Sequence, residues 1–75
     1  MGACHTYYDE LRFDVRNPEL TEVYMYIRCE GDCPHTIMGW HHKTFASTVS
    51  AQGILEKIGT GEEDPIMWPM KAPPQ

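Results

Sequence analysis

The sequence contains no long apolar run and no recognisable targeting segment. No stretch approaches the roughly 20 consecutive apolar residues that a membrane-spanning helix needs. The N-terminus also lacks a charged region followed by an apolar one, which is the pattern of a secretory signal. We therefore expect a cytoplasmic chain with no membrane association.

Cysteine is scarce, and its three residues are an odd number for a disulfide framework. Disulfides are also rare in a reducing compartment such as the cytosol. The simpler expectation is of free or metal-bound thiols. A Cys29–Cys33 disulfide is a lesser alternative.

Basic residues are few as well. Six Lys and Arg residues stand against eleven Asp and Glu residues, which gives a net charge of −5. The basic residues are scattered, whereas phosphate binding needs them clustered, so nucleic acid is not the expected partner. Three acids form a run at Glu62, Glu63 and Asp64. Such a run suits either solubility or docking on a basic protein surface.

Catalytic motifs are missing too. A chain of 75 residues buries only about 60% of the surface that its unfolded form exposes, which leaves little room for an enclosed pocket. Cys33 and His35 are neighbours, but no known family motif surrounds them to supply an orienting third group. Gly59 and Gly61 lack the Gly-Lys-Ser/Thr sequence of a phosphate loop. We expect that the protein is not an enzyme.

Three segments show the alternation of strands that have one buried face. Residues 7–15 and 22–30 carry apolar side chains at every second position, and residues 36–45 do so less regularly. The clearest strand places four side chains on one face: Val23, Met25, Ile27 and Cys29. Residues 1–6 precede the first strand and are expected to be flexible.

The sequence alone does not fix the register in which the third strand pairs with the second. One pairing puts Met25 near Trp40, which would extend the apolar face of the second strand. A slip of one residue exchanges His41 and His42 between the two faces. Gly39 marks a candidate bulge, which would also switch the faces.

Residues 48–58 carry the periodicity of a helix with one apolar stripe. The stripe consists of Ala51, Ile54, Leu55 and Ile58. Ser47 or Thr48 can cap the start of this helix. We expect Gly59 to end it in a left-handed conformation.

Residues 62–75 combine the acidic run with an apolar, proline-rich tail. Proline occurs here at four positions and excludes a helix or a central strand: Pro65, Pro69, Pro73 and Pro74. Between them lie Ile66, Met67, Trp68 and Met70. The tail either packs on the core or docks on another molecule, and packing is the commoner arrangement because exposed apolar patches are rare.

These elements together predict one small α+β domain over residues 1–75. Its architecture is a three-stranded antiparallel β-meander with one α-helix on one face, in the order β-β-β-α, and an apolar Pro-rich C-terminal tail. The order resembles that of some small DNA-binding modules that read DNA with the sheet. Their basic sheet face is missing here, so the likeness implies nothing about function.

One set of residues has the types and spacing of a zinc site. Zinc prefers four tetrahedral nitrogen or sulfur ligands, and two thiolates beside a tight turn commonly supply half of them. The candidate ligands are Cys29, Cys33, His35 and one histidine of the third strand, His41 or His42. Otherwise Cys29 is a small buried apolar residue, as free cysteine often is.

The surplus of aromatic, methionine and acidic residues favours a second hypothesis, a non-catalytic protein-interaction module. Its candidate contact residues are Tyr24, Tyr26, Trp40, Glu62, Glu63, Asp64, Trp68 and Met70. Interfaces favour aromatic residues and methionine. In general character the chain resembles the stoichiometric inhibitors of bacteriophages and mobile elements. We expect a protein partner with a basic surface, or a homodimer, and a zinc-stabilised domain is the alternative function.

Overall fold

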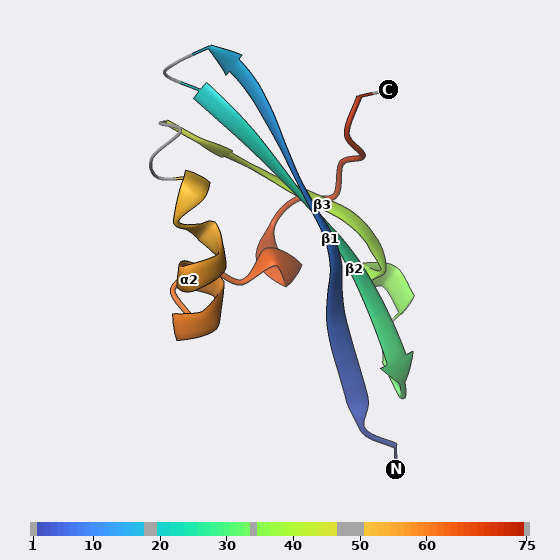
Figure 1. Cartoon of the computed structure of the whole chain (residues 1–75). Helices are drawn as coiled ribbons and strands as arrows, with labels where there is room; N and C mark the ends of the chain where they lie inside the picture. Colours follow the sequence, from blue (N-terminus) through green and yellow to red (C-terminus); the bar gives the residue numbers. More distant parts are fainter. Residues whose placement is uncertain (1, 18–19, 34, 47–50, 75) are drawn as a thin grey trace.

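The computed structural model describes residues 2–17, 20–33, 35–46 and 51–74. Within these described ranges six elements follow one another: strand β1 (Cys4–Asn17), strand β2 (Leu20–Gly31), a 3-10 turn η1 (His35–Ile37), strand β3 (Gly39–Phe45), helix α2 (Ile54–Thr60) and a 3-10 turn η2 (Pro65–Met67). The strands form one antiparallel sheet in the order β1-β2-β3 (Figure 1). The predicted β-β-β-α fold is therefore confirmed.

The long β1–β2 hairpin starts earlier in the chain than expected. Cys4 already pairs with Gly31, so residues 4–6 belong to the sheet rather than to a flexible N-terminus. A bulge at Asp9 interrupts the register between Tyr8 and Glu10. Because a bulge inserts one residue, it changes which positions face the core. The residues of β1 on the core side of the sheet are Cys4, Thr6 and Tyr8 before the bulge, and Leu11, Phe13 and Val15 after it.

Strand β3 takes the register in which Met25 pairs with His41 and Tyr26 pairs with Trp40. The pairing of Met25 with Trp40 is therefore wrong by one residue, and His41 faces the core. The strand also begins at Gly39 rather than at residue 36, because η1 occupies the preceding residues. Gly39 has a φ of 128°, which only glycine adopts without strain. With this conformation Gly39 begins the strand in which His41 faces the core and His42 faces the opposite side.

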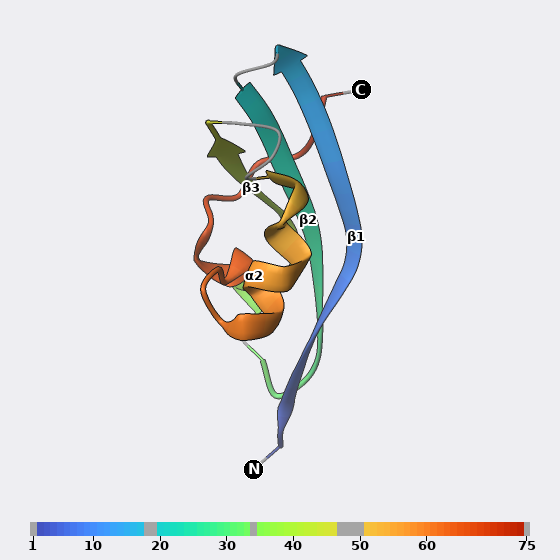
Figure 2. The same cartoon turned by 60° about the vertical axis from the view of Figure 1, so that its left-hand side comes forward.

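Helix α2 lies against one face of the sheet (Figure 2), and the hydrophobic core lies on that face. Its buried members are Val23, Met25, Ile27, Cys29, Phe45, Ala51, Ile54 and Trp68. Helix α2 continues to Thr60, and Gly61 rather than Gly59 adopts the left-handed cap conformation, with its N–H donating to the carbonyl of Ile58. The expected caps Ser47 and Thr48 lie outside the described residues.

The C-terminal tail packs on its own chain. Trp68 is buried in the core, where its ring meets that of Phe45 edge-to-face at 6.2 Å. Beyond it the tail runs along the outer edge of β3: the N–H of His42 donates to the carbonyl of Pro69, and the N–H of Lys71 donates to that of Trp40. The tail then leaves the helix side of the sheet (Figure 1). The intramolecular alternative is therefore the one observed.

The molecule is more extended than a compact chain of this length. Its radius of gyration is 13.0 Å, whereas about 11 Å is expected for 75 residues. The difference arises because a short helix sits on a long hairpin: α2 spans about 10 Å, but the 14 residues of β1 span about 46 Å. No helix among the described residues has the length and apolar character needed to cross a membrane.

Candidate functional site

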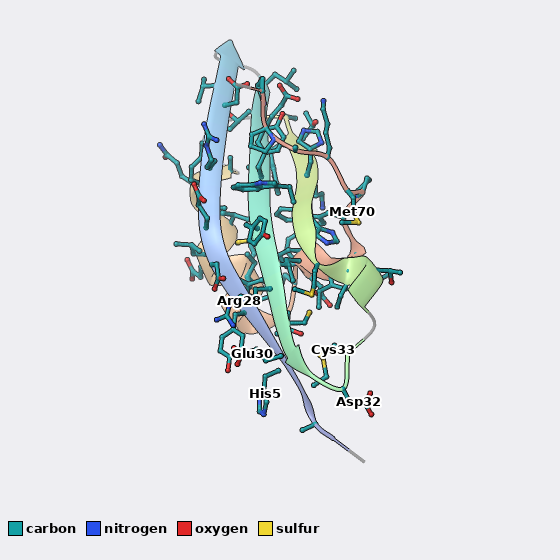
Figure 3. All side chains as sticks on the ribbon, turned by 90° about the vertical axis from the view of Figure 1, so that its right-hand side faces the viewer. His5, Arg28, Glu30, Asp32, Cys33 and Met70 are labelled. Carbon is teal, nitrogen blue, oxygen red and sulfur yellow. A yellow bond between two sulfur atoms is a disulfide. The ribbon has the colours of Figure 1, made fainter. Side chains whose placement is uncertain are left out.

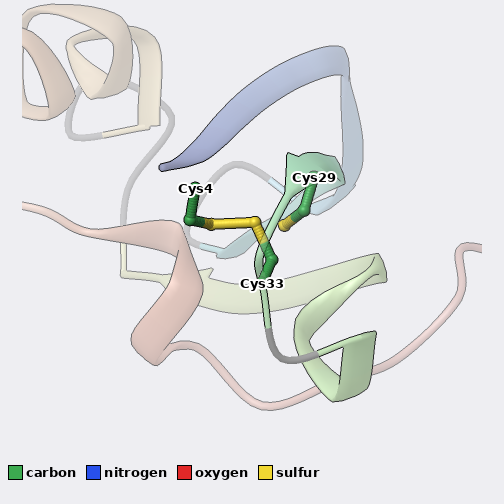
Figure 4. A group of neighbouring side chains, drawn as sticks. All are labelled: Cys4, Cys29 and Cys33. Carbon is green, nitrogen blue, oxygen red and sulfur yellow. A yellow bond between two sulfur atoms is a disulfide. The ribbon is translucent and has the colours of Figure 1, made fainter. Parts of the chain in front are cut away.

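Three cysteines from different elements meet at one end of the hairpin, and we call them the cysteine cluster (Cys4, Cys29 and Cys33). Their sulfur atoms all lie within 4.8 Å of one another. Cys4 and Cys33 form a disulfide, and Cys29 is a free, buried thiol beside it (Figure 4). The expectation of three free or metal-bound thiols is thus wrong for this pair, and the alternative Cys29–Cys33 disulfide does not form.

The backbone around Gly31 explains this pairing. Gly31 has a φ of 99°, and a Cβ built on it would lie 2.0 Å from the carbonyl oxygen of Ala3. Only glycine allows the end of β2 to approach the start of β1 so closely. The turn then closes through two backbone hydrogen bonds, from Asp32 to Ala3 at 3.2 Å and from Cys33 to Gly31 at 3.1 Å. Cys33 is therefore held next to Cys4.

His41 is not part of the cysteine cluster. It pairs with Met25, four residues before Cys29, which is about 13 Å along β2. Its buried ring lies between two backbone carbonyls: Nδ1 is 2.9 Å from the oxygen of Trp68 and Nε2 is 2.7 Å from that of Ile37. The predicted ligand set is therefore not assembled around His41, which instead connects the tail to η1.

The other candidate histidines do not complete the set either. His42 points to the opposite face of the sheet, where its Nε2 lies 3.1 Å from Glu22 Oε1 and its ring lies 4.7 Å from that of Tyr24. The side chain of His35 lies outside the described part of the chain. Cys4 and His5 stand in the sequence only as spare donors beyond the predicted set, and the structure brings the sulfur of Cys4 into the cluster.

The structure places two of the predicted aromatic contact residues in the interior. Tyr24 is 1% exposed and Trp68 is 6% exposed, so neither presents a surface to a partner. Tyr26 and Trp40 lie half-buried on the face opposite the helix, with their rings edge-to-face at 5.2 Å. Met70 remains exposed beside the edge of β3 (Figure 3).

Two residues of the acidic run, Glu63 and Asp64, make contacts within the chain, and Asp64 does so while exposed. Glu63 accepts hydrogen bonds from Lys43 and from the indole N–H of Trp68, and the bond with Lys43 is the main cause that lowers the pKa of Glu63. Asp64 caps η2 by accepting from the N–H of Ile66 at 3.2 Å. Glu62 is exposed. Most of the run therefore stabilises the fold.

Asp64 also tethers β1 to the segment that follows the helix. The hydroxyl of Tyr8 donates to it at 3.4 Å. Desolvation raises the pKa of Tyr8, and the nearby carboxylate adds to that shift. This contact fixes the N-terminal half of β1 against η2.

An exposed apolar surface on the C-terminal half of β1 is the feature that the sequence reasoning missed. Phe13 is 46% exposed and Val15 is 55% exposed, although both face the core side of the sheet. We call these two residues the β1 apolar patch. They line a hollow of about 320 Å³ together with Thr21 and Gln52. Their alternation was visible in the sequence, but it indicated a buried face.

Comparisons with family models, with curated proteins and with solved structures find no match for the chain. Two features of the chain itself bear on its function, the cysteine cluster and the β1 apolar patch. They lie at opposite ends of β1, at Cys4 and at Phe13 to Val15.

Proposed function

We propose that this protein is a non-catalytic interaction module that binds a protein partner through β1, as an inhibitor or an adaptor. The observation that carries the proposal is the exposure of Phe13 and Val15 on the core side of the sheet. Apolar side chains that stay exposed beside a folded core are typical of interaction sites. The partner covers the two side chains that the described residues of the chain leave exposed.

The free edge of β1 supports the same site. Strand β1 lies at one end of the sheet, and no other described strand pairs with its outer edge. The opposite edge, along β3, is covered by Pro69 and Lys71 of the tail. An edge strand with unpaired backbone groups accepts an added strand from another chain. The bulge at Asp9 disrupts the first half of this edge, so pairing is expected along residues 10–15.

The charge of the chain favours a basic partner. Two of the six cations are engaged in close ion pairs. Arg28 lies beside Glu30 (Figure 3) and also bonds Asp9 at 2.7 Å, and Lys43 pairs with Glu63. Because acids outnumber bases by five, most of the charged groups outside these pairs are carboxylates. Complementary charge raises the association rate more than the final affinity. Salt should therefore slow association with the partner.

The sulfur chemistry supports the non-catalytic part of the proposal. Cys33 was the residue considered as a nucleophile beside His35. Its sulfur is bonded to Cys4, and a nucleophile must be a free thiolate. The remaining thiol, Cys29, is buried. Neither cysteine presents an accessible nucleophile in this state.

The test compares substitutions on and off the β1 apolar patch. A partner is first captured from an extract of the native host, and its affinity is then measured for wild type, Phe13→Glu, Val15→Glu and Met67→Glu. Met67 is 80% exposed and lies outside the patch, which makes it the matched control. Each patch variant should weaken binding at least about 10-fold, which corresponds to about 1.4 kcal/mol.

Two results would count against a separate partner at this surface. Unchanged affinity of both patch variants would place the contact elsewhere. Sedimentation that shows a wild-type dimer, dissociated by Val15→Glu but not by Met67→Glu, would identify the occupant as a second copy of the chain. Circular dichroism of each variant establishes that the sheet is retained before binding is compared.

A further inference from the structure

The cysteine cluster combines ligand type, spacing and accessibility in a way that the interaction module does not require. We propose that Cys4, Cys29 and Cys33, once the Cys4–Cys33 disulfide is reduced, bind one soft d10 metal ion, Zn²⁺ or Cu⁺, through three thiolates. Thiolate ligands select these ions over harder cations. The proposal is independent of the β1 apolar patch at the other end of the strand.

The distances between the sulfur atoms suit such a site. A zinc–sulfur bond of about 2.3 Å places tetrahedral thiolate ligands about 3.8 Å apart. The three sulfur atoms already lie within 4.8 Å of one another. Small changes in side-chain torsion are therefore enough to surround one ion, and no strand has to move.

The backbone holds the three cysteines in place without help from the disulfide. Cys29 pairs with Thr6 and Cys4 pairs with Gly31 in the β1–β2 ladder. Cys33 is fixed by the turn at Gly31, through the hydrogen bonds from Asp32 to Ala3 and from Cys33 to Gly31. Reduction breaks the Cys4–Cys33 bond only. The hydrogen bonds of the β1–β2 pairing and of the turn at Gly31 remain. The site is therefore largely preformed in the reduced chain.

The burial of the three residues describes a site that is open on one side. Cys29 is 7% exposed, Cys33 is half-buried, and Cys4 is exposed. An ion enters from the side of Cys4 and rests on the sulfur of Cys29. Three protein ligands with one open position are typical of zinc sites that keep a water molecule.

Reduction and metal binding are separate, balanced steps. A dithiol reductant transfers two electrons and two protons to the Cys4–Cys33 disulfide, which yields two thiols, and the reductant becomes a disulfide itself. The metal ion then replaces three thiol protons, which pass to the buffer. In the oxidised chain only Cys29 has a free thiol. Oxidation therefore excludes the metal, and bound metal protects all three thiols.

The experiment uses the full chain, reduced with dithiothreitol and freed of reductant without oxygen. Zn²⁺ and Cu⁺ are titrated separately against a competing chromophoric chelator, and thiols protected from alkylation are counted by mass spectrometry. The proposal expects one ion per chain, three thiols protected together, and no stoichiometric binding by the oxidised chain. Binding of only one of the two ions identifies the occupant.

Matched variants separate a true site from adventitious thiol binding. Cys29→Ser and Cys4→Ser should each lower metal affinity at least about 100-fold, since even the loss of an outer-shell partner costs up to that factor. His5→Ala is the control, because His5 follows Cys4 directly but lies on the opposite face with Arg28 and Glu30 (Figure 3). It should bind as wild type does.

Two outcomes would overturn the proposal. One is Cys29→Ser that binds as tightly as wild type, since Cys29 would then be only a buried apolar residue. The other is a reduced wild type whose thiols stay fully reactive toward alkylation in the presence of either ion. Thiol counting in the wild type needs no variant, so a poorly folded variant does not leave the question open.

Discussion

Trp68 is the residue through which the C-terminal tail joins the core, and Trp68→Ala measures how much of the fold depends on that segment. The indole ring is 6% exposed, packs against Phe45, and donates its N–H to Glu63 at 3.1 Å. The substitution removes the ring, its aromatic contact and the hydrogen bond together. The smaller alanine leaves a cavity beneath α2.

The expected loss of stability is large relative to the total free energy of unfolding of the chain. A buried aromatic side chain removes about 150–250 Å² from water, which corresponds to about 4–6 kcal/mol at 25 cal/mol per Å². Measured truncations of buried aromatic residues cost about 3–5 kcal/mol. A chain of 75 residues has a total stability of about 4–11 kcal/mol. We therefore expect Trp68→Ala to lose about 3–5 kcal/mol, close to half of the total.

Urea denaturation followed by far-ultraviolet circular dichroism measures this loss with the disulfide kept oxidised. At an m-value of about 1.5 kcal/mol/M, the midpoint should fall by about 2–3 M. Met67→Ala is the control: Met67 precedes Trp68 and is 80% exposed, so its replacement should change stability by no more than about 0.5 kcal/mol. A Trp68→Ala variant within about 1 kcal/mol of wild type would refute the reasoning, because the tail would not be core.

Two further substitutions test contacts of the same region. Glu63→Gln should remove one contribution to the pH dependence of folding stability. The hydrogen bond with Lys43 lowers the pKa of Glu63 from 4.5, so the folded chain binds this proton less tightly than the unfolded chain. Its stabilisation is present above about pH 4.5 and is lost as pH falls through the lower folded pKa. Urea midpoints of the variant and wild type should differ at pH 7 and converge as the pH falls below the folded pKa of Glu63, and equal midpoints at pH 7 would contradict this. His41→Phe should cost about 1–3 kcal/mol in the same assay, because a buried carbonyl of Ile37 or Trp68 loses its donor. A phenylalanine variant as stable as wild type would show that these contacts contribute nothing.

The strands and the helix were predictable because their signals are local. Alternation over residues 7–15 and 22–30 depends on neighbouring side chains that point to opposite faces, and the stripe around Ile54 depends on the helical repeat. One member of that predicted stripe, Leu55, is 63% exposed and does not pack on the core. The order of elements along the chain then implied the β-β-β-α arrangement. Element ends were less predictable. Gly59 and Gly61 are equivalent candidates in the sequence, and the hydrogen bond to Ile58 selects the second.

The phase of β3 and the role of its histidines depended on distant parts of the chain. The backbone turn at Gly39 and the preceding η1 place His41 on the core face. The carbonyl of Trp68, 27 residues away, then binds its ring. Because a shift of one residue exchanges the two faces, no local pattern could assign His41 to the interior and His42 to the opposite face.

The sequence by itself determined which residues have the chemistry of a site, and the tertiary structure decided which of them meet. Three cysteines were countable, but the disulfide joins residues 29 positions apart, and that contact depends on the β1–β2 register and the close approach at Gly31. Likewise, alternation showed that Phe13 and Val15 share a face. Whether that face is covered depends on where the rest of the chain packs, which only the folded chain sets.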